Sequence, residues 1–146
     1  MDEDLDFEQW EAAIGKLLMA FARVEYELLQ LYKAWLPMRD YFRDSFDQRF
    51  DKAIGACKRH LPGNNNVIGL LIKMKQWGRL RHLIAHNPIE AHVYEEGGER
   101  CVSFFIVDSK GSEERVSLAD LRNTSLSAWR ASVALAVELR INVQGS

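Results

Sequence analysis

The sequence predicts one helix-dominated domain spanning residues 1–146, a four-helix up-and-down bundle with a small β-hairpin between the third and fourth helices. Apolar residues recur at helical spacing over most of the chain, and strand-like alternation is confined to one short segment after the third helix. No repeat, low-complexity tract or linker divides the 146 residues. With 47% hydrophobic and 27% charged residues, the composition is that of a folded globular protein and excludes a disordered or disulfide-stapled chain.

The first helix is predicted by the most regular pattern in the chain. Nine apolar residues, beginning at Phe7 and ending at Trp35, follow one another at alternating spacings of three and four. This stripe predicts a helix over residues 6–36 that ends at Pro37. Glu25 lies beside the stripe, where it is either an ordinary flanking charge or the anchor for a cation from another helix.

A second helix is predicted over residues 39–60. Phe42, Phe46, Phe50 and Ile54 recur every four residues and give this segment one apolar face. Residues 61–66 contain a Pro, a Gly and three Asn, which ends the helix in a loop. We expect that loop to finish in an N-cap for the next helix.

A third helix is predicted over residues 67–86, with Asn87-Pro88 as its stop. Its apolar stripe continues the spacing of three and four residues. Arg81 occupies a position in that stripe where leucine would be expected. A cation on an apolar face needs a partner or a ligand, so Arg81 marks a candidate site.

The period changes after the third helix. Residues 91–94 and 101–107 alternate around Gly97-Gly98 and predict a β-hairpin, and residues 115–117 are a candidate third strand. The apolar side chains of Val102, Phe104 and Ile106 would cover the bundle or extend a dimer interface.

A last helix is predicted from a capping box that starts at Ser117 to about Arg140. Its apolar positions include Leu118, Leu121, Trp129, Val133 and Val137, and we expect the tryptophan to lie in the core.

The net charge of −2 is unevenly distributed. Residues 52–89 carry seven cations and no acid, whereas the rest of the chain carries a net charge of −9. Mild overall acidity argues against broad coating of nucleic acid. The acid-free stretch is either a solvated face or a local site for an anionic ligand.

Other features exclude export and membrane insertion. The longest apolar run covers residues 17–22, far short of the roughly 20 residues that cross a bilayer. The N-terminus is acidic where a signal peptide is basic. Cys57 and Cys101 stand in unlike contexts and are expected to be free thiols. We therefore expect a cytoplasmic protein with no membrane partner.

Residues with catalytic potential gather at the end of the third helix. Two arginines and two histidines lie between Arg79 and His86, inside the acid-free stretch. Histidine exchanges protons near neutral pH, and arginine binds phosphate through a bidentate fork. Together they supply the base, the acid and the cation that metal-free cleavage of RNA requires.

The segment from Arg81 to His86 resembles the signature of the HEPN family, in which an Arg is followed by a polar residue, three further residues and a His. The long amphipathic first helix and the position of the motif near a helix end are similar too. The resemblance implies a metal-independent endoribonuclease of toxin or defence type that works as a homodimer. It also allows a catalytically silent relative that binds RNA or nucleotide, or assembles with a partner protein such as an antitoxin.

The resemblance also implies roles for individual residues. His86 would be the general acid and base, and Arg81 would clamp the phosphate and stabilise the transition state. His82 and Asn87 would orient these groups or the scissile phosphate. No metal or cofactor is expected.

Two alternatives concern the arginine and the histidines. Arg79 lies seven residues before His86, so helical geometry places Lys75, Arg79, His82 and His86 in one polar stripe that leaves Arg81 aside. Arg79 therefore competes with Arg81 as the functional arginine.

His82 and His86 also have the spacing of a zinc pair, with His92 as a conceivable third ligand. Alternatively, His86 and Asn87 only cap the end of the helix.

Overall fold

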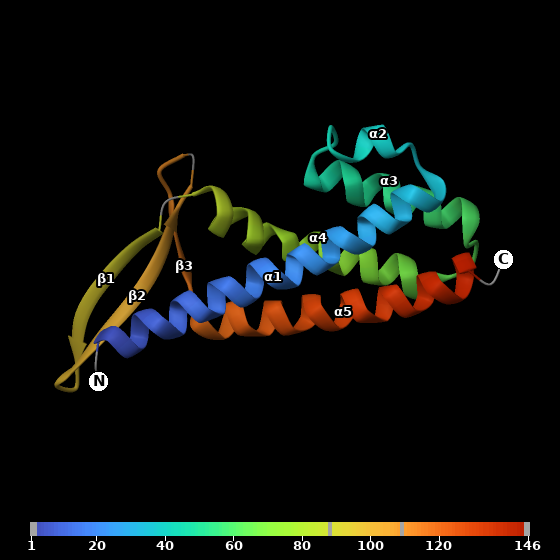
Figure 1. Ribbon diagram of the computed structural model, residues 1–146. Coiled ribbons are helices and arrows are strands. Elements are labelled where there is room, and N and C mark those ends of the chain that lie inside the picture. Colours follow the sequence, from blue (N-terminus) through green and yellow to red (C-terminus); the bar gives the residue numbers. More distant parts are fainter. Residues whose placement is uncertain (1–2, 88, 109, 145–146) are drawn as a thin grey trace.

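The computed structural model describes residues 3–87, 89–108 and 110–144 (Figure 1). Within these residues five helices surround the core, and three strands form one antiparallel sheet in the order β1-β2-β3. The predicted helix-dominated class with a small antiparallel sheet is therefore confirmed.

Two long helices form the spine of the molecule. Helix α1 (Glu3–Trp35) and helix α5 (Leu118–Gln144) lie side by side and run in the same direction, whereas α4 (Asn65–His86) runs back against them (Figure 1). The arrangement differs from a simple up-and-down bundle, in which consecutive helices alternate in direction. Helix α4 returns the chain to the end where α1 starts, and the sheet lies at that end, so α5 begins there and runs parallel to α1 (Figure 1).

The predicted stripe of the first helix forms the core face of α1. Leu17, Phe21, Val24 and Leu28 are fully buried. Aromatic residues at both ends of the stripe are less enclosed: Phe7 is exposed and Trp35 is only partly buried. The middle of α1 is thus fixed by packing on several elements, which matters because Glu25 lies there.

The predicted second helix is wrong as a single element. The structure has a short helix α2 (Met38–Tyr41) and a separate helix α3 (Phe46–His60). Ser45 begins α3 with a capping box: its Oγ accepts the Gln48 backbone N–H at 3.2 Å, and its own N–H donates to Gln48 Oε1 at 2.8 Å. The break removes Phe42 from the apolar face and leaves it 78% exposed, while Phe50 is buried.

Helix α4 begins where the loop prediction places a cap. The side-chain oxygen of Asn64 accepts the Val67 backbone N–H at 3.3 Å. Near its middle, Gly78 allows α3 to approach closely, because a Cβ atom at this position would overlap the ring of Phe46. Gly69, in the same helix, has open space around its missing side chain.

This difference predicts opposite effects of two alanine substitutions in α4. Gly78→Ala should lower the free energy of unfolding by about 1–3 kcal/mol, since the methyl group overpacks the contact with Phe46. Gly69→Ala should raise it by up to about 1 kcal/mol, because alanine favours the helix and meets nothing. Urea unfolding of the two variants measures both values, and equal shifts in the same direction would contradict the close approach.

The sheet confirms the predicted hairpin and its short third strand. Strand β1 (Ile89–Glu96) pairs with β2 (Glu99–Val107) around a turn in which Gly97 and Gly98 both have positive φ, and β3 (Glu113–Val116) adds to β2. Phe104 and Ile106 of β2 are buried, and the Phe104 ring lies 4.2 Å from that of Trp10 in α1. The β2 face therefore covers the end of the helices, whereas β1 is exposed along its whole length.

In the last helix Leu121 is buried as predicted, but the core position predicted for Trp129 is wrong. Trp129, Val133 and Val137 are 44–50% exposed, and small residues face the core beside Leu121 and Leu135. The buried small residues are Ser125, Ala128, Ala131, Ser132 and Ala136. They let α1 and α5 pack closely, and this packing turns the larger apolar side chains outward.

Neither a membrane span nor a disulfide is found in the part of the chain that the structure describes. No helix there combines the length and apolar character needed to cross a bilayer. Both cysteines are free thiols, as predicted, and burial raises the pKa of Cys57 to about 11.

Candidate functional site

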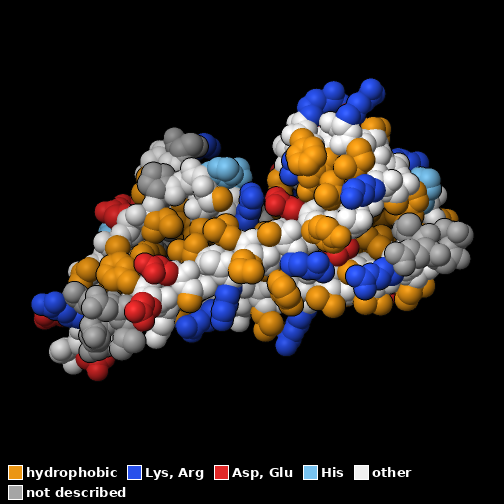
Figure 2. Space-filling model, in the orientation of Figure 1, with side chains coloured by type: hydrophobic (Ala, Val, Ile, Leu, Met, Phe, Trp, Pro, Cys, Tyr) orange, Lys and Arg blue, Asp and Glu red, His pale blue; other side chains and the backbone are white. Residues whose placement is uncertain are grey.

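A cleft of about 1110 Å³ separates the C-terminal half of α4 from the start of α3, with the middle of α1 at its base. In Figure 2 it is the notch at the top of the molecule, with charged side chains at its base and histidine on one wall. The cleft is lined by five of the six residues predicted for the site: Lys75, Arg79, Arg81, His82 and His86.

Asn87 is the predicted residue that does not line the cleft. It caps the end of α4 instead: its side-chain Nδ2 and its backbone N–H both donate to the carbonyl of Leu83, at 3.1 and 3.2 Å. The capping alternative is therefore correct for Asn87, because both of its donors are used within the helix end.

The two histidines lie next to each other on one turn of α4. Their ring centroids are 4.7 Å apart, and both residues are exposed. Because neither ring is enclosed by the core, both imidazoles have access to a ligand in the cleft. The spacing of four residues places them on one face, as expected for a helix.

Arg81 crosses from α4 to α1. Its Nη2 lies 3.4 Å from Oε1 of Glu25, and its guanidinium carbon lies 5.7 Å from the ring centroid of Phe46. The side chain of Arg81 is only 23% exposed. Its place in an apolar stripe is explained by these contacts, and the second interpretation of Glu25, as an anchor for a cation, is confirmed.

Arg79 and Lys75 lie on the outer part of the same wall. Arg79 makes a bidentate pair with Glu114 of β3 at 2.9 and 3.0 Å, and this pairing raises the pKa of its guanidinium. Lys75 donates to Asp51 of α3 at 2.8 Å, which raises the pKa of its ammonium. Both cations belong to the predicted stripe, and both are already bound to carboxylates at the surface.

The fold therefore places carboxylates from other segments beside the cations of the acid-free stretch. Carboxylates from α1, α3 and β3 reach its cations, and the cleft is lined by four cationic and four acidic side chains. The acidic members are Glu25, Asp44, Asp47 and Asp51. Within the cleft, these carboxylates therefore balance the positive charge of the stretch.

A hydrogen bond to its backbone carbonyl holds Glu25 in position. The hydroxyl of Tyr41 donates to the Glu25 carbonyl at 2.9 Å. Arg49 supports the tyrosine, because its Nε donates to the Tyr41 carbonyl at 2.6 Å and its guanidinium lies 4.2 Å from the ring centroid. Residues of α2 and α3 thus hold the backbone of Glu25, the partner of Arg81.

Asp44 forms a second buried connection at the edge of the cleft. It accepts a hydrogen bond from Tyr32 at 2.9 Å and pairs with Lys52 at 2.7 Å. The hydrogen bond from Lys52, with that from Tyr32, lowers the pKa of the Asp44 carboxyl. Burial and the same hydrogen bond raise the pKa of Tyr32.

A carboxyl with a lowered pKa makes stability depend on acid. Because Asp44 holds its proton less tightly in the folded state than in the unfolded chain, its stabilising contribution is complete above about pH 4 and is lost as the pH falls further. Asp44→Asn should therefore be less stable than the parent near pH 7, and the difference should shrink toward pH 3. Urea unfolding at several pH values measures this, with Glu96→Gln, an exposed carboxylate of β1, as control; a difference independent of pH would contradict it.

The structure does not assemble the conceivable zinc set of His82, His86 and His92. His92 lies on β1 with Glu90, at 3.1 Å, and with Glu113 of β3. The three ligand atoms of this exposed group lie within 4.8 Å of one another. It is separate from the cleft residues and contributes nothing to them.

Several cleft residues were not predicted from the sequence. Arg49, Asp44 and Asp51 come from the segment predicted as one continuous helix. Glu114, which pairs with Arg79 but does not line the cleft, comes from a strand of only four residues. One available signal was Ser45-x-x-Gln48, a capping-box pattern inside the proposed helix, which marks the start of α3.

Comparison with known proteins identified no relative of this chain. No protein-family model matches the chain, and no significant match was found among curated proteins or solved structures. The functional argument therefore depends on the motif and on the geometry of the cleft.

Proposed function

We propose that the protein is a metal-independent endoribonuclease of HEPN type, acting in a toxin or defence role, with its cleft forming half of a composite site in a homodimer. One observation carries the proposal: Arg81 and two exposed histidines line the same cleft. These are the groups that RNA cleavage without a metal requires. The description of the helices as a HEPN-like four-helix bundle is part of the same proposal.

The reaction needs a proton acceptor, a proton donor and a cation. A histidine removes the proton of the 2′-hydroxyl, the 2′-oxygen attacks phosphorus, and the bond from phosphorus to the 5′-oxygen breaks. A protonated histidine then supplies the proton of the departing 5′-oxygen. The products are a 2′,3′-cyclic phosphate and a 5′-hydroxyl, and no metal enters any step.

His86 of each copy is assigned the acid or base role, and His82 is assigned to orient its neighbour or the scissile phosphate. Arg81 stabilises the negative charge that develops on the pentavalent phosphorus. The carboxylate of Glu25 already holds that guanidinium at 3.4 Å, so RNA phosphate competes with Glu25 for it. Arg79 is the alternative residue for stabilising this charge, and it is less favoured because it binds Glu114 at the surface.

The test is incubation of the purified protein with single-stranded and structured RNA in EDTA. We expect cleavage that persists in EDTA and leaves 2′,3′-cyclic phosphate ends, with cleavage by His86→Ala, purified in parallel, reduced at least about 100-fold. Equal activity in the variant and the parent would identify a contaminating ribonuclease. Activity that EDTA abolishes would support a metal-dependent mechanism instead.

The composite site requires two copies of the chain. Light scattering over a range of concentrations is expected to give the mass of a dimer. A protein that remains monomeric at the highest concentration would contradict the composite site, because one cleft contributes only half of the catalytic groups.

A second candidate is a non-catalytic HEPN-like module that binds RNA or nucleotide, or assembles with a partner protein such as an antitoxin. It is favoured by the pairing of Lys75, Arg79 and Arg81 with carboxylates, which leaves the cleft with balanced charge. Absence of cleavage across varied RNAs, with the folded dimer intact, would favour this function.

A further inference from the structure

The outer side of the α1–α5 pair carries an exposed apolar surface whose side chains do not line the cleft. We name it the α1–α5 outer face and define it by seven exposed side chains: Met19, Tyr26, Leu126, Trp129, Val133, Val137 and Ile141. Five of these follow one another along α5 at spacings of three and four residues. By the rise of a helix, that row is about 22 Å long.

Single exposed apolar residues are normal, but a row of them along one helix face indicates an interaction surface. A stripe at this spacing fits the apolar face of another helix, which would place its own side chains at i, i+3, i+4 and i+7. Four of the five side chains on α5 are aliphatic or β-branched, so the surface offers packing against a hydrophobic helix and little ring area for stacking bases.

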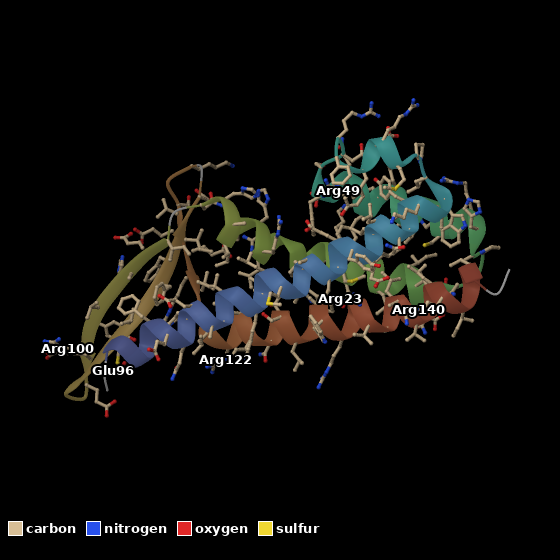
Figure 3. All side chains as sticks on the ribbon, in the orientation of Figure 1. Arg23, Arg49, Glu96, Arg100, Arg122 and Arg140 are labelled. Atoms are coloured by element: carbon tan, nitrogen blue, oxygen red, sulfur yellow. The ribbon has the colours of Figure 1, made fainter. Side chains whose placement is uncertain are left out.

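Cations surround this apolar row. Arg23, Arg122 and Arg140 lie along the same side of the two helices (Figure 3), and Lys16 and Arg130 are exposed on the same two helices. No acidic residue occurs between residues 12 and 24 of α1 or between residues 121 and 137 of α5.

Glu27 of α1 is a carboxylate that is withdrawn from the solvent. Glu27 is 4% exposed, and its side chain lies 3.3 Å from Arg23 at the base of a small pocket between α1 and α5. Desolvation raises the pKa of Glu27, although Arg23 and Arg140 act in the opposite direction. A ligand on the outer face therefore meets apolar side chains and positive charge.

We propose that the α1–α5 outer face binds an amphipathic helix of a partner protein whose polar flanks are rich in Glu and Asp. The apolar row supplies the contact area, and the surrounding arginines pair with the acidic flanks. Charge argues against a second copy as the occupant, since face-to-face pairing would place arginines beside arginines. The proposal is independent of the ribonuclease proposal, because none of its residues lines the cleft.

The probe for this surface is a designed helical peptide of about 18 residues, long enough to span the row at about 1.5 Å per residue. It carries leucine at every third and fourth position and glutamate on both flanks, and a matched peptide carries lysine instead of glutamate. Fluorescence anisotropy of the labelled peptides is measured against the full-length protein. We expect binding of the acidic peptide that weakens with salt, and at least tenfold weaker binding of the basic peptide.

Two substitutions assign the binding to this face. Val133→Glu places a charge in the apolar row and should weaken the acidic peptide at least tenfold, while Phe42→Glu, an exposed residue beside α2, is the matched control and should not. Arg130→Glu should weaken the acidic peptide and strengthen the basic one. Circular dichroism checks that each variant is folded.

Four results would overturn the proposal. Equal binding of the two peptides, or binding that Val133→Glu leaves unchanged, would show that the face does not select an acidic helix. A dimer that Val133→Glu converts to a monomer would assign the face to a second copy. An RNA oligonucleotide whose affinity is lost in Val133→Glu would assign it to nucleic acid.

Discussion

RNA cleavage in EDTA is expected to fall by about 10²–10⁴-fold when His86 is replaced by alanine, because the reaction then loses a general acid or base. His86 is exposed at the end of α4, so its removal costs little packing, and the variant should fold like the parent. The measurement is the initial rate on a labelled RNA, with both proteins at the same concentration.

His92→Ala is the matched control for this experiment. It removes a histidine of the same chain that lies on β1 with Glu90 and Glu113. Its rate should equal that of the parent. If His86→Ala and His92→Ala lose activity equally, the loss reflects general damage and not the chemistry of the cleft.

Arg81→Ala is expected to reduce cleavage by about 10²–10³-fold, as removal of a group that stabilises transition-state charge does. Arg79→Ala should reduce it less than tenfold, because Arg79 is occupied by Glu114 at the surface. Arg81→Lys separates charge from geometry: lysine keeps the positive charge but not the planar fork, so activity between those of the parent and Arg81→Ala is expected.

Stability must be measured beside these rates, since Arg81 also connects α4 to Glu25 and Phe46. Glu25→Gln serves this purpose, because it removes the same ion pair and leaves the arginine in place. If Arg81→Ala and Glu25→Gln are equally unstable but only the first is inactive, the arginine acts in the reaction. Equal losses in Arg79→Ala and Arg81→Ala would show that neither spacing nor burial identifies the functional arginine.

The elements that could be predicted from the sequence are those in which large apolar residues follow one period without interruption. Helices α1 and α4 and the β1–β2 hairpin satisfy this condition. The predicted second helix failed because the row of phenylalanines continues across Ser45, where a local capping box begins a new helix. In α5 the larger side chains mark the outer face, because close packing on α1 selects Ser125, Ala128 and Ser132 for the inner one.

Most residues of the candidate site could be predicted from the sequence, but the pairing of their charges could not. Helical geometry alone brings Lys75, Arg79 and both histidines to one side of α4. Arg81 lies outside that stripe, but its side chain also lines the cleft. Their partners come from α1, α3 and β3, which are distant in the chain, and no count of charges along the sequence reveals that pairing. The net charge of a segment therefore did not predict the net charge of the surface that it forms.

The ion pairs of the cleft have a thermodynamic consequence for any phosphate-bearing ligand. A cation that is already neutralised by a carboxylate of its own protein holds few salt ions from solution, so its transfer to a phosphate releases few of them. Binding of RNA in the cleft should accordingly vary weakly with salt concentration.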